Sequence, residues 1–197
     1  MFNNQYSIFW LVQVGVIYIV AALFPCIGVH AQVSYGGYPP GLMHQVFMKS
    51  TSAHVVKVTP PDVEKLLAED RANEGRAVPY RYAKMIPVSF SIDQDGVWVD
   101  LPSGERVWQL SISAQDALGI ELEFDRFYIP EGGQLFAYNH NGEYIIGAFT
   151  HRSNDESGGF STQVIPGSRM TLEYVPPAND FSQPNVELSI SHVGYVY

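Results

Sequence analysis

The most constraining feature of the chain is the stretch from Ile129 to Thr150, in which two apolar, aromatic-rich runs flank a polar turn. This pattern predicts a β-hairpin, because Asn141-Gly142 readily takes both central positions of a type I′ turn. Gly132-Gly133 can supply the positive φ that a tight turn before the first run needs. Two neighbouring strands are therefore expected in a fixed register.

Alternation of apolar and polar residues extends to both sides of this hairpin. Arg106 to Ser113 and Leu118 to Ile129 both show the period of two that is typical of strands with one face on a core. The residues expected to face that core are Trp108, Leu110, Ile112, Ile120, Leu122 and Phe124. Further strand candidates are Val55 to Val58, Met85 to Ile92, Val97 to Val99, Phe160 to Val164, Arg169 to Val175 and Val186 to Val193. About nine strands without intervening helices predict an all-β fold, an antiparallel β-sandwich or jelly roll.

One short amphipathic helix is predicted before the strands, at residues 60–74. Pro60-Pro61 is tolerated where a helix begins, and Gly75 is a natural end. Its apolar stripe is expected to dock on the sheets, because so short a helix is not stable alone. Residues 32–54 are interpreted as a flexible or extended segment, and Gln32 to Gly41, rich in Gly, Pro and Tyr, is assigned no structure. Residues 55–197 form the predicted β-sandwich domain.

The first 31 residues contain no Lys, Arg, Asp or Glu, and Ile8 to Phe24 is apolar apart from Gln13. Residues 1–31 are therefore predicted to be a signal peptide cleaved after Ala31, which would place the protein outside the cell or in the periplasm. An uncleaved membrane anchor is the alternative, and a lipoprotein acylated at Cys26 is a third interpretation. Membrane contact is expected only through this leader.

Composition limits the partners of the exported part. The only cysteine, Cys26, lies in the leader, so the mature chain is expected to be stabilised by burial rather than by disulfides. The formal net charge of −9 argues against nucleic acid or an anionic membrane as a partner, since both call for a basic patch. Nothing in the sequence sets the oligomeric state.

Two fragments are similar to segments of trypsin-like serine proteases. Thr51-Ser52-Ala53-His54 is similar to the segment that carries the catalytic histidine, and Asp155 to Gly159 is similar to the segment around the nucleophile. The second match fails in detail, because Asp155 stands where the motif has a glycine that shapes the oxyanion hole. The predicted helix follows His54 almost at once, unlike the barrel strands of those enzymes. We therefore expect no complete catalytic triad in this chain, and interpret Ser157 as part of a small polar loop.

Metal and cofactor sites are not expected. His140, His151, Asp155 and Glu156 include plausible ligand types, but no two histidines have ligand-like spacing on a predicted element. Solvated histidines next to turns explain them better. Asp93 to Gly96 starts like a calcium loop but lacks the later bidentate Glu, and is interpreted as an Asp-Gly hairpin turn.

The order of several segments resembles the N-terminal pro-region of secreted bacterial lysyl endopeptidase-like serine proteases. These segments are VTPPDVEKLLAED (Val58 to Asp70), GERVWQLSI (Gly104 to Ile112), ALGIELEFDRFYIPEGGQLFAY (Ala117 to Tyr138), IIGAFT (Ile145 to Thr150), FSTQVIPG (Phe160 to Gly167), LEYVPP (Leu172 to Pro177) and LSISHVGY (Leu188 to Tyr195). The resemblance covers about Val55 to Tyr197. It implies a β-rich region between a signal peptide and a trypsin-like catalytic domain, which would be expected beyond Tyr197. No position matches the family's catalytic segments, so no catalytic role is carried over.

The expected function is therefore that of a non-catalytic pro-domain, which assists the folding of a serine endopeptidase, keeps it latent, or both. Its partner would be the catalytic domain in the same chain. The segments expected to contact that partner comprise one loop and one aromatic residue, namely Ser153, Asn154, Asp155, Glu156, Ser157 and Trp98. The alternative is a secreted binding or adhesion module for glycan or protein that uses Trp98 or loop tyrosines.

Overall fold

The structure, a computed structural model, describes residues 34–44, 55–178 and 185–197. All of them belong to one compact unit, Val33–Tyr197. The leader, Cys26 and His54 lie outside the described residues, so the expectations for them remain predictions. In the part of the chain that the structure describes, no helix is long and apolar enough to cross a membrane.

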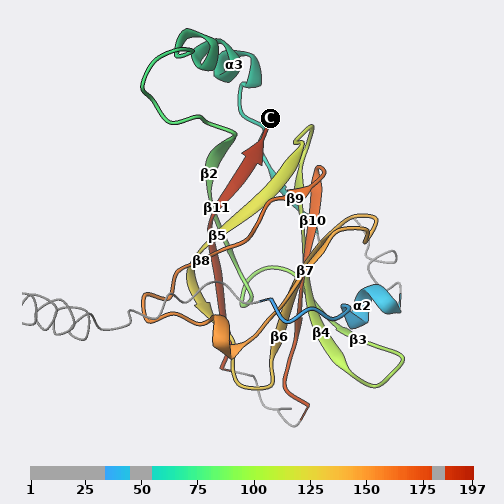
Figure 1. Cartoon of the computed structure of the whole chain (residues 1–197). Coiled ribbons are helices and arrows are strands. Elements are labelled where there is room, and N and C mark those ends of the chain that lie inside the picture. Colours follow the sequence, from blue (N-terminus) through green and yellow to red (C-terminus); the bar gives the residue numbers. More distant parts are fainter. Residues whose placement is uncertain (1–33, 45–54, 179–184) are drawn as a thin grey trace, which may run out of the picture. The chain divides into compact units, whose positions relative to one another are not determined.

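Two β-sheets form the fold, as the alternating sequence predicts (Figure 1). Sheet A has the order β1-β4-β10-β6-β7, and β3 pairs with β4 beside β1. Its strands are β1 (Val55–Val58), β3 (Val97–Asp100), β4 (Arg106–Ala114), β6 (Gln134–Asn139), β7 (Ile145–Phe149) and β10 (Arg169–Val175). Sheet B has the order β2-β11-β5-β8, and β9 also pairs with β5. Its strands are β2 (Ala83–Ser91), β5 (Gly119–Tyr128), β8 (Phe160–Ser161), β9 (Ile165–Pro166) and β11 (Glu187–Val196).

The main core lies between the two sheets and is built by the residues that the alternation predicts. Trp108, Leu110 and Ile112 face it from β4, and Ile120, Leu122 and Phe124 face it from β5. The indole of Trp108 donates to the carbonyl oxygen of Asp95 at 2.9 Å, which satisfies its polar atom. The predicted all-β sandwich is thus confirmed, and a buried apolar core lies between its sheets.

Three local features differ from the predictions. The pair β1 and β4 is parallel, whereas an all-antiparallel fold was expected. The hairpin β6–β7 closes with Gly142 N donating to Asn139 O, so His140-Asn141 is the central pair and only Gly142 has positive φ. Residues 93–96 do form a turn, but it joins β2 of sheet B to β3 of sheet A and is therefore not a hairpin.

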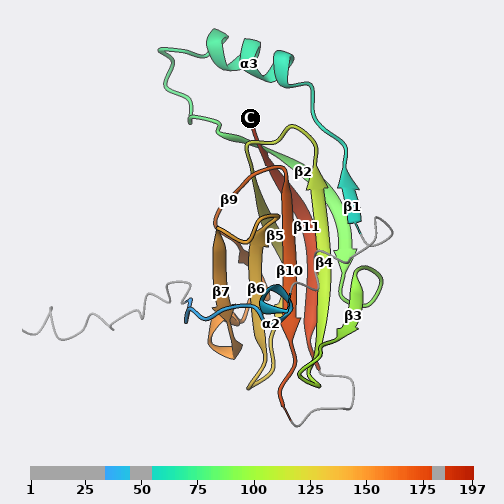
Figure 2. The ribbon, with the colours of Figure 1, turned by 90° about the vertical axis from the view of Figure 1, so that its right-hand side faces the viewer.

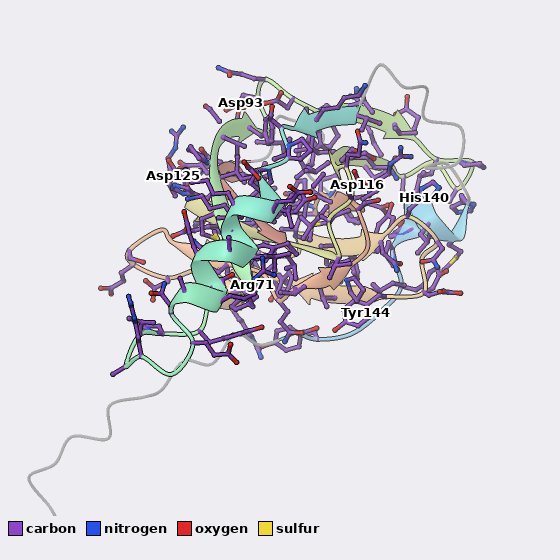
Figure 3. All side chains as sticks on the ribbon, turned by 90° about the horizontal axis from the view of Figure 1, so that it is seen from above. Arg71, Asp93, Asp116, Asp125, His140 and Tyr144 are labelled. Carbon is purple, nitrogen blue, oxygen red and sulfur yellow. The ribbon has the colours of Figure 1, made fainter. Side chains whose placement is uncertain are left out.

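The predicted helix is α3 (Val63–Ala72), which begins after Asp62, whose side chain accepts from Lys65 N at 3.0 Å. Leu66 is buried and Val63 packs against the main core, while Leu67 is exposed. In Figure 3, which looks onto the helix, Arg71 is labelled on its exposed surface.

Residues 34–44 follow a defined course, although the sequence predicts a flexible segment there. They contain the short helix α2 (Pro40–Met43), in which Gly41 and Leu42 are buried. Figure 2 shows α2 in front of β6 and β10, on the face of sheet A that points away from the main core. This segment explains why residues on both faces of β6 are buried.

Candidate functional site

The loop after β7 was predicted to contact a partner, and its shape is set by local hydrogen bonds. The helical turn η3 (His151–Ser153) begins it. Asn154 then binds both backbone groups of Ile129, accepting from its N and donating to its O at 2.9 Å each. Asp155, Glu156 and Ser157 are exposed, while Ser153 and Asn154 are partly buried. The loop is thus held against the end of β5 and presents its last three polar side chains to solvent.

Ser157 stands in a compact turn rather than in a catalytic arrangement. Its backbone N donates to Asp155 Oδ1 at 2.8 Å, and its Oγ accepts from Gly159 N at 3.2 Å. These are the bonds that Asp and Ser side chains make in ordinary turns. A nucleophilic serine needs its hydroxyl hydrogen-bonded to a base, and His54, the base suggested by the sequence, lies outside the described residues.

A second serine and histidine pair lies on the outer face of sheet B, together with a carboxylate. His192 Nδ1 is 3.1 Å from Ser191 Oγ and 3.4 Å from Glu123 Oε2. In a catalytic triad the hydroxyl and the carboxylate bind opposite nitrogens of the imidazole, so that a proton taken at one side is balanced at the other. Here both partners meet the same nitrogen. This cluster therefore cannot act as a triad in the described geometry.

Trp98 does not present a free ring for sugar stacking. It is partly buried and packs against the main core, with its ring edge-on to that of Tyr174 at 6.3 Å between centroids. The guanidinium carbon of Arg106 lies 5.5 Å from the centroid of the indole ring. This geometry is a cation–π contact, which occupies a ring face that a sugar would need.

Metal ligands do not converge in residues 34–44, 55–178 and 185–197. No group of three or more His, Cys, Asp or Glu side chains there is placed to hold an ion. The candidate ligands separate in the fold, since His140 lies in the β6–β7 turn, whereas Asp155 lies in the loop before β8.

The outer face of sheet A carries a site that the sequence did not suggest, centred on Glu173 of β10. Glu173 is fully buried. One of its oxygens accepts from Gly41 N at 2.6 Å, and the other accepts from Gln109 Nε2 at 2.9 Å and from Tyr138 Oη at 2.8 Å. Burial raises the pKa of Glu173 above its ordinary value, although the three donors oppose this shift. Burial and the nearby carboxyl likewise raise the pKa of the Tyr138 phenol.

Residues 34–44 cover the Glu173 site on the outer face of sheet A. Tyr35 N and Gly36 N donate to Ala148 O and Gly147 O at 3.0 Å, and Ala148 N donates back to Gly36 O at 2.9 Å. Ser34 Oγ also donates to Gly147 O. The segment thus pairs with the open edge of β7 before it crosses the sheet to reach Glu173.

Leu42 is the apolar anchor of the same segment. It is buried in a small cluster with Phe136, Tyr138 and Ala148, which is separate from the main core. Its side chain also lies close to Gly142, where a Cβ would come within 2.9 Å of Leu42 Cδ1. The signal that could have indicated this face is the apolar run Leu135 to Tyr138, because such a run is typical of a strand buried on both faces.

Three side chains link α3, the start of β2 and the end of β11, and we name them the ionic brace: Asp70, Arg81 and Tyr197. Arg81 Nη2 bonds Leu66 O at 3.0 Å and lies 2.8 Å from Asp70 Oδ1, and Tyr197 Oη donates to Asp70 Oδ2 at 2.7 Å. Burial, followed by this bond, raises the pKa of the Tyr197 phenol. The brace ties the last turns of α3 to the start of β2 and to the end of β11.

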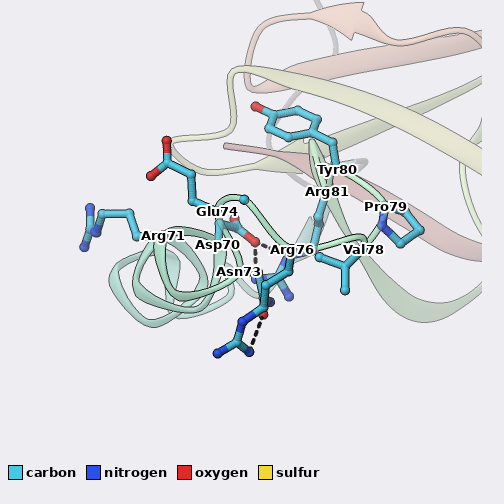
Figure 4. Close-up of a pocket in the computed structure, with 10 residues that line it drawn as sticks. Asp70, Arg71, Asn73, Glu74, Arg76, Val78, Pro79, Tyr80 and Arg81 are labelled. Atoms are coloured by element: carbon cyan, nitrogen blue, oxygen red, sulfur yellow. Dashed lines mark hydrogen bonds and ion pairs between the residues drawn. The ribbon is translucent and has the colours of Figure 1, made fainter.

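A hollow of about 610 Å³ lies beside this brace, in the connection between α3 and β2 (Figure 4). Its lining includes Asp70, Glu74, Arg76, Tyr80 and Arg81. This lining combines side chains of both charges with one exposed aromatic ring.

Two exposed side chains, Tyr82 and Leu118, flank the end of β11 and are 49 and 69% exposed. Together with Tyr80, which lies two positions before Tyr82 and is 88% exposed, we name them the terminal patch. Tyr82 directly precedes Ala83, which pairs with Val196 from β2. Leu118 N donates to Val196 O at 2.9 Å from the other side. The phenol of Tyr82 donates to Glu121 Oε2 at 2.9 Å. This bond fixes the position of the Tyr82 ring and raises the pKa of the phenol.

No known family profile matches the chain.

Proposed function

We propose that this chain is the non-catalytic pro-region of a secreted trypsin-like serine endopeptidase, which assists the folding of the catalytic domain, keeps it latent, or both. The terminal patch is the observation that supports this proposal most directly. Exposed apolar side chains grouped around one strand end mark surfaces that bind other proteins. The resemblance of the strand segments to lysyl endopeptidase pro-regions supplies the kind of partner.

The position of the patch suits a partner in the same chain. Leu118 and Tyr82 flank Val196, the last residue of β11, so a domain following Tyr197 would meet both side chains as it leaves the sandwich. The loop with Asn154 and Ser157 adjoins Ile129, at the opposite end of β5 from Gly119, which pairs with Val196. We therefore assign the partner contact to the terminal patch rather than to that loop.

The first test is the coding sequence that follows Tyr197. A trypsin-like domain is expected there, and a stop codon would sink the proposal of a partner in the same chain. If the domain is present, its catalytic part is refolded with and without residues 32–197 added as a separate chain. The pro-region should raise the yield of active protease or inhibit the folded enzyme. Equal yield and equal activity in both samples would overturn the proposal.

The surface is tested by a double variant, Tyr80→Ser with Leu118→Ser, which should weaken either effect. The matched control is Tyr128→Ser, at the far end of β5, where the ring is 42% exposed. A control that is as damaging as the double variant would argue against the terminal patch.

The alternative function is a binding module for another secreted protein. Protein is favoured over glycan as the ligand, because Trp98 is partly buried and one face of its ring is covered by Arg106. This alternative predicts that the terminal patch binds a separate chain and that a protease refolds equally well without residues 32–197.

A further inference from the structure

We propose that the outer face of sheet A is a peptide-binding site, which residues 34–44 occupy within the same chain and which the same peptide can occupy from another chain. The contacts of residues 34–44 are of the kinds by which proteins bind peptides, namely strand addition at a sheet edge and an apolar anchor in a pocket. Tyr35 and Gly36 add main-chain hydrogen bonds to the β7 edge, Leu42 fills an apolar socket, and Gly41 N meets a buried carboxylate. This inference does not depend on the protease partner proposed above.

The segment is separable from the sandwich. The main core contains no residue from 34–44, and Leu42 belongs to a cluster of its own with Phe136, Tyr138 and Ala148. The six strands of sheet A pair directly with one another, and the segment only adds bonds to the outer edge of β7 and to Glu173. Its removal would therefore open one face of a sheet while leaving the pairing of both sheets intact.

The receptor face recognises a backbone group of the segment through one buried carboxylate. Glu173 is fully buried and uses one oxygen for Gly41 N, while Gln109 and Tyr138 hold the other oxygen in place. A carboxylate held in this way is a preorganised acceptor for the N–H of an incoming peptide.

Sequence preference follows from the space at the same point. A Cβ at Gly41 would lie 2.3 Å from Gln109 Nε2 and 2.5 Å from Glu173 Oε2, so any larger residue there would require these side chains or the segment to shift. At Gly37 a Cβ would meet the Phe136 ring at 3.5 Å, which is ordinary contact. The ligand class is therefore a peptide that pairs with β7 and then forms a short helical turn with a Gly-Leu step, in which glycine meets Glu173 and leucine fills the socket.

The test uses the full chain with the recognition sequence of a specific protease inserted within residues 45–54. After cleavage, a synthetic peptide of residues 34–44 with a fluorophore at its C-terminus is added in excess, and its anisotropy is measured. Saturable binding at one peptide per chain is expected. The uncleaved chain should bind the peptide far more weakly, because its own segment competes at high effective concentration.

Three matched peptides test the mode of binding. Gly41→Ala and Leu42→Ala should each reduce affinity roughly tenfold or more, because one collides with Glu173 and the other empties the socket. Met43→Ala is the control, since Met43 is 62% exposed in the same helix, and it should bind like the parent. Absence of saturable binding, equal affinity of the Gly41→Ala peptide, or unfolding of the sandwich on cleavage, seen by near-UV circular dichroism, would each overturn the proposal.

Discussion

Replacing Gly41 by alanine should destabilise the sandwich, although the change favours a helix in isolation. Alanine is better than glycine in a helix interior by about 1 kcal/mol, and a four-residue helix such as α2 would gain only part of this. Against this gain, the added Cβ would lie 2.3 Å from Gln109 Nε2 and 2.5 Å from Glu173 Oε2, both of which are buried. The clash must be relieved by moving one side or the other.

The cost of that movement can be worked out from the contacts. If the segment lifts, the hydrogen bond from Gly41 N to Glu173 is lost, and bonds to charged groups contribute about 1.5–3 kcal/mol. If the sheet side chains shift instead, overpacking costs about 1–3 kcal/mol. Either route exceeds the propensity gain, so we expect a net loss of about 1–2 kcal/mol in the free energy of unfolding.

Urea unfolding of residues 32–197, followed by tryptophan fluorescence, measures this loss. With a slope of about 2 kcal/mol per molar urea, the midpoint should fall by about 0.5–1 M without a change of slope. Met43→Ala serves as the control and should stay within about 0.5 kcal/mol of the parent, because Met43 is exposed. A Gly41→Ala variant as stable as the parent would refute the close packing of Gly41 on Glu173.

Three further predictions concern other groups. Burial raises the pKa of Glu173, so its contribution to stability is fully present below its unfolded pKa near 4 and is lost as pH rises through the folded pKa. The parent should therefore lose stability relative to Glu173→Gln as the pH rises above about 4, and urea midpoints of the two proteins that change in parallel with pH would contradict the shift. Tyr197→Phe removes the bond to Asp70 and should lower the free energy of unfolding by about 0.5–1.5 kcal/mol; an unchanged thermal midpoint would show that this bond contributes nothing. Ser157→Ala should change stability by less than about 0.5 kcal/mol, and a fluorophosphonate probe should leave Ser157 unlabelled, since its hydroxyl serves a turn; labelling would reverse this interpretation.

The sequence predicts the strands well where one periodic face meets the core. The observed bounds of β10 equal the predicted Arg169–Val175, and Ile120, Leu122 and Phe124 all face inward. Alternation is a local signal, and one slip of register would expose a whole apolar face, so such strands are strongly specified. The fold class follows from the number of strands and the absence of intervening helices.

The Glu173 site could not be predicted in the same way. Gly41 and Glu173 are 132 positions apart, and residues 34–44 have no apolar period that would indicate burial. The segment is positioned by backbone bonds and by one leucine, which leave no repeating pattern in the sequence. The β6–β7 turn was misjudged for a related reason, because Asn141-Gly142 fits two turn geometries and the flanking strands decide between them.

The place of β11 in sheet B has a consequence for the order of synthesis. This strand lies between β2 and β5, pairing with both, although it is made after every other strand of the two sheets. Until residues 187–196 have left the ribosome, sheet B therefore lacks β11, the strand that joins β2 to β5. Pairings between distant segments also form slowly, because loop closure must precede the contacts that reward it. Sheet B can therefore be completed only after β11 has been translated.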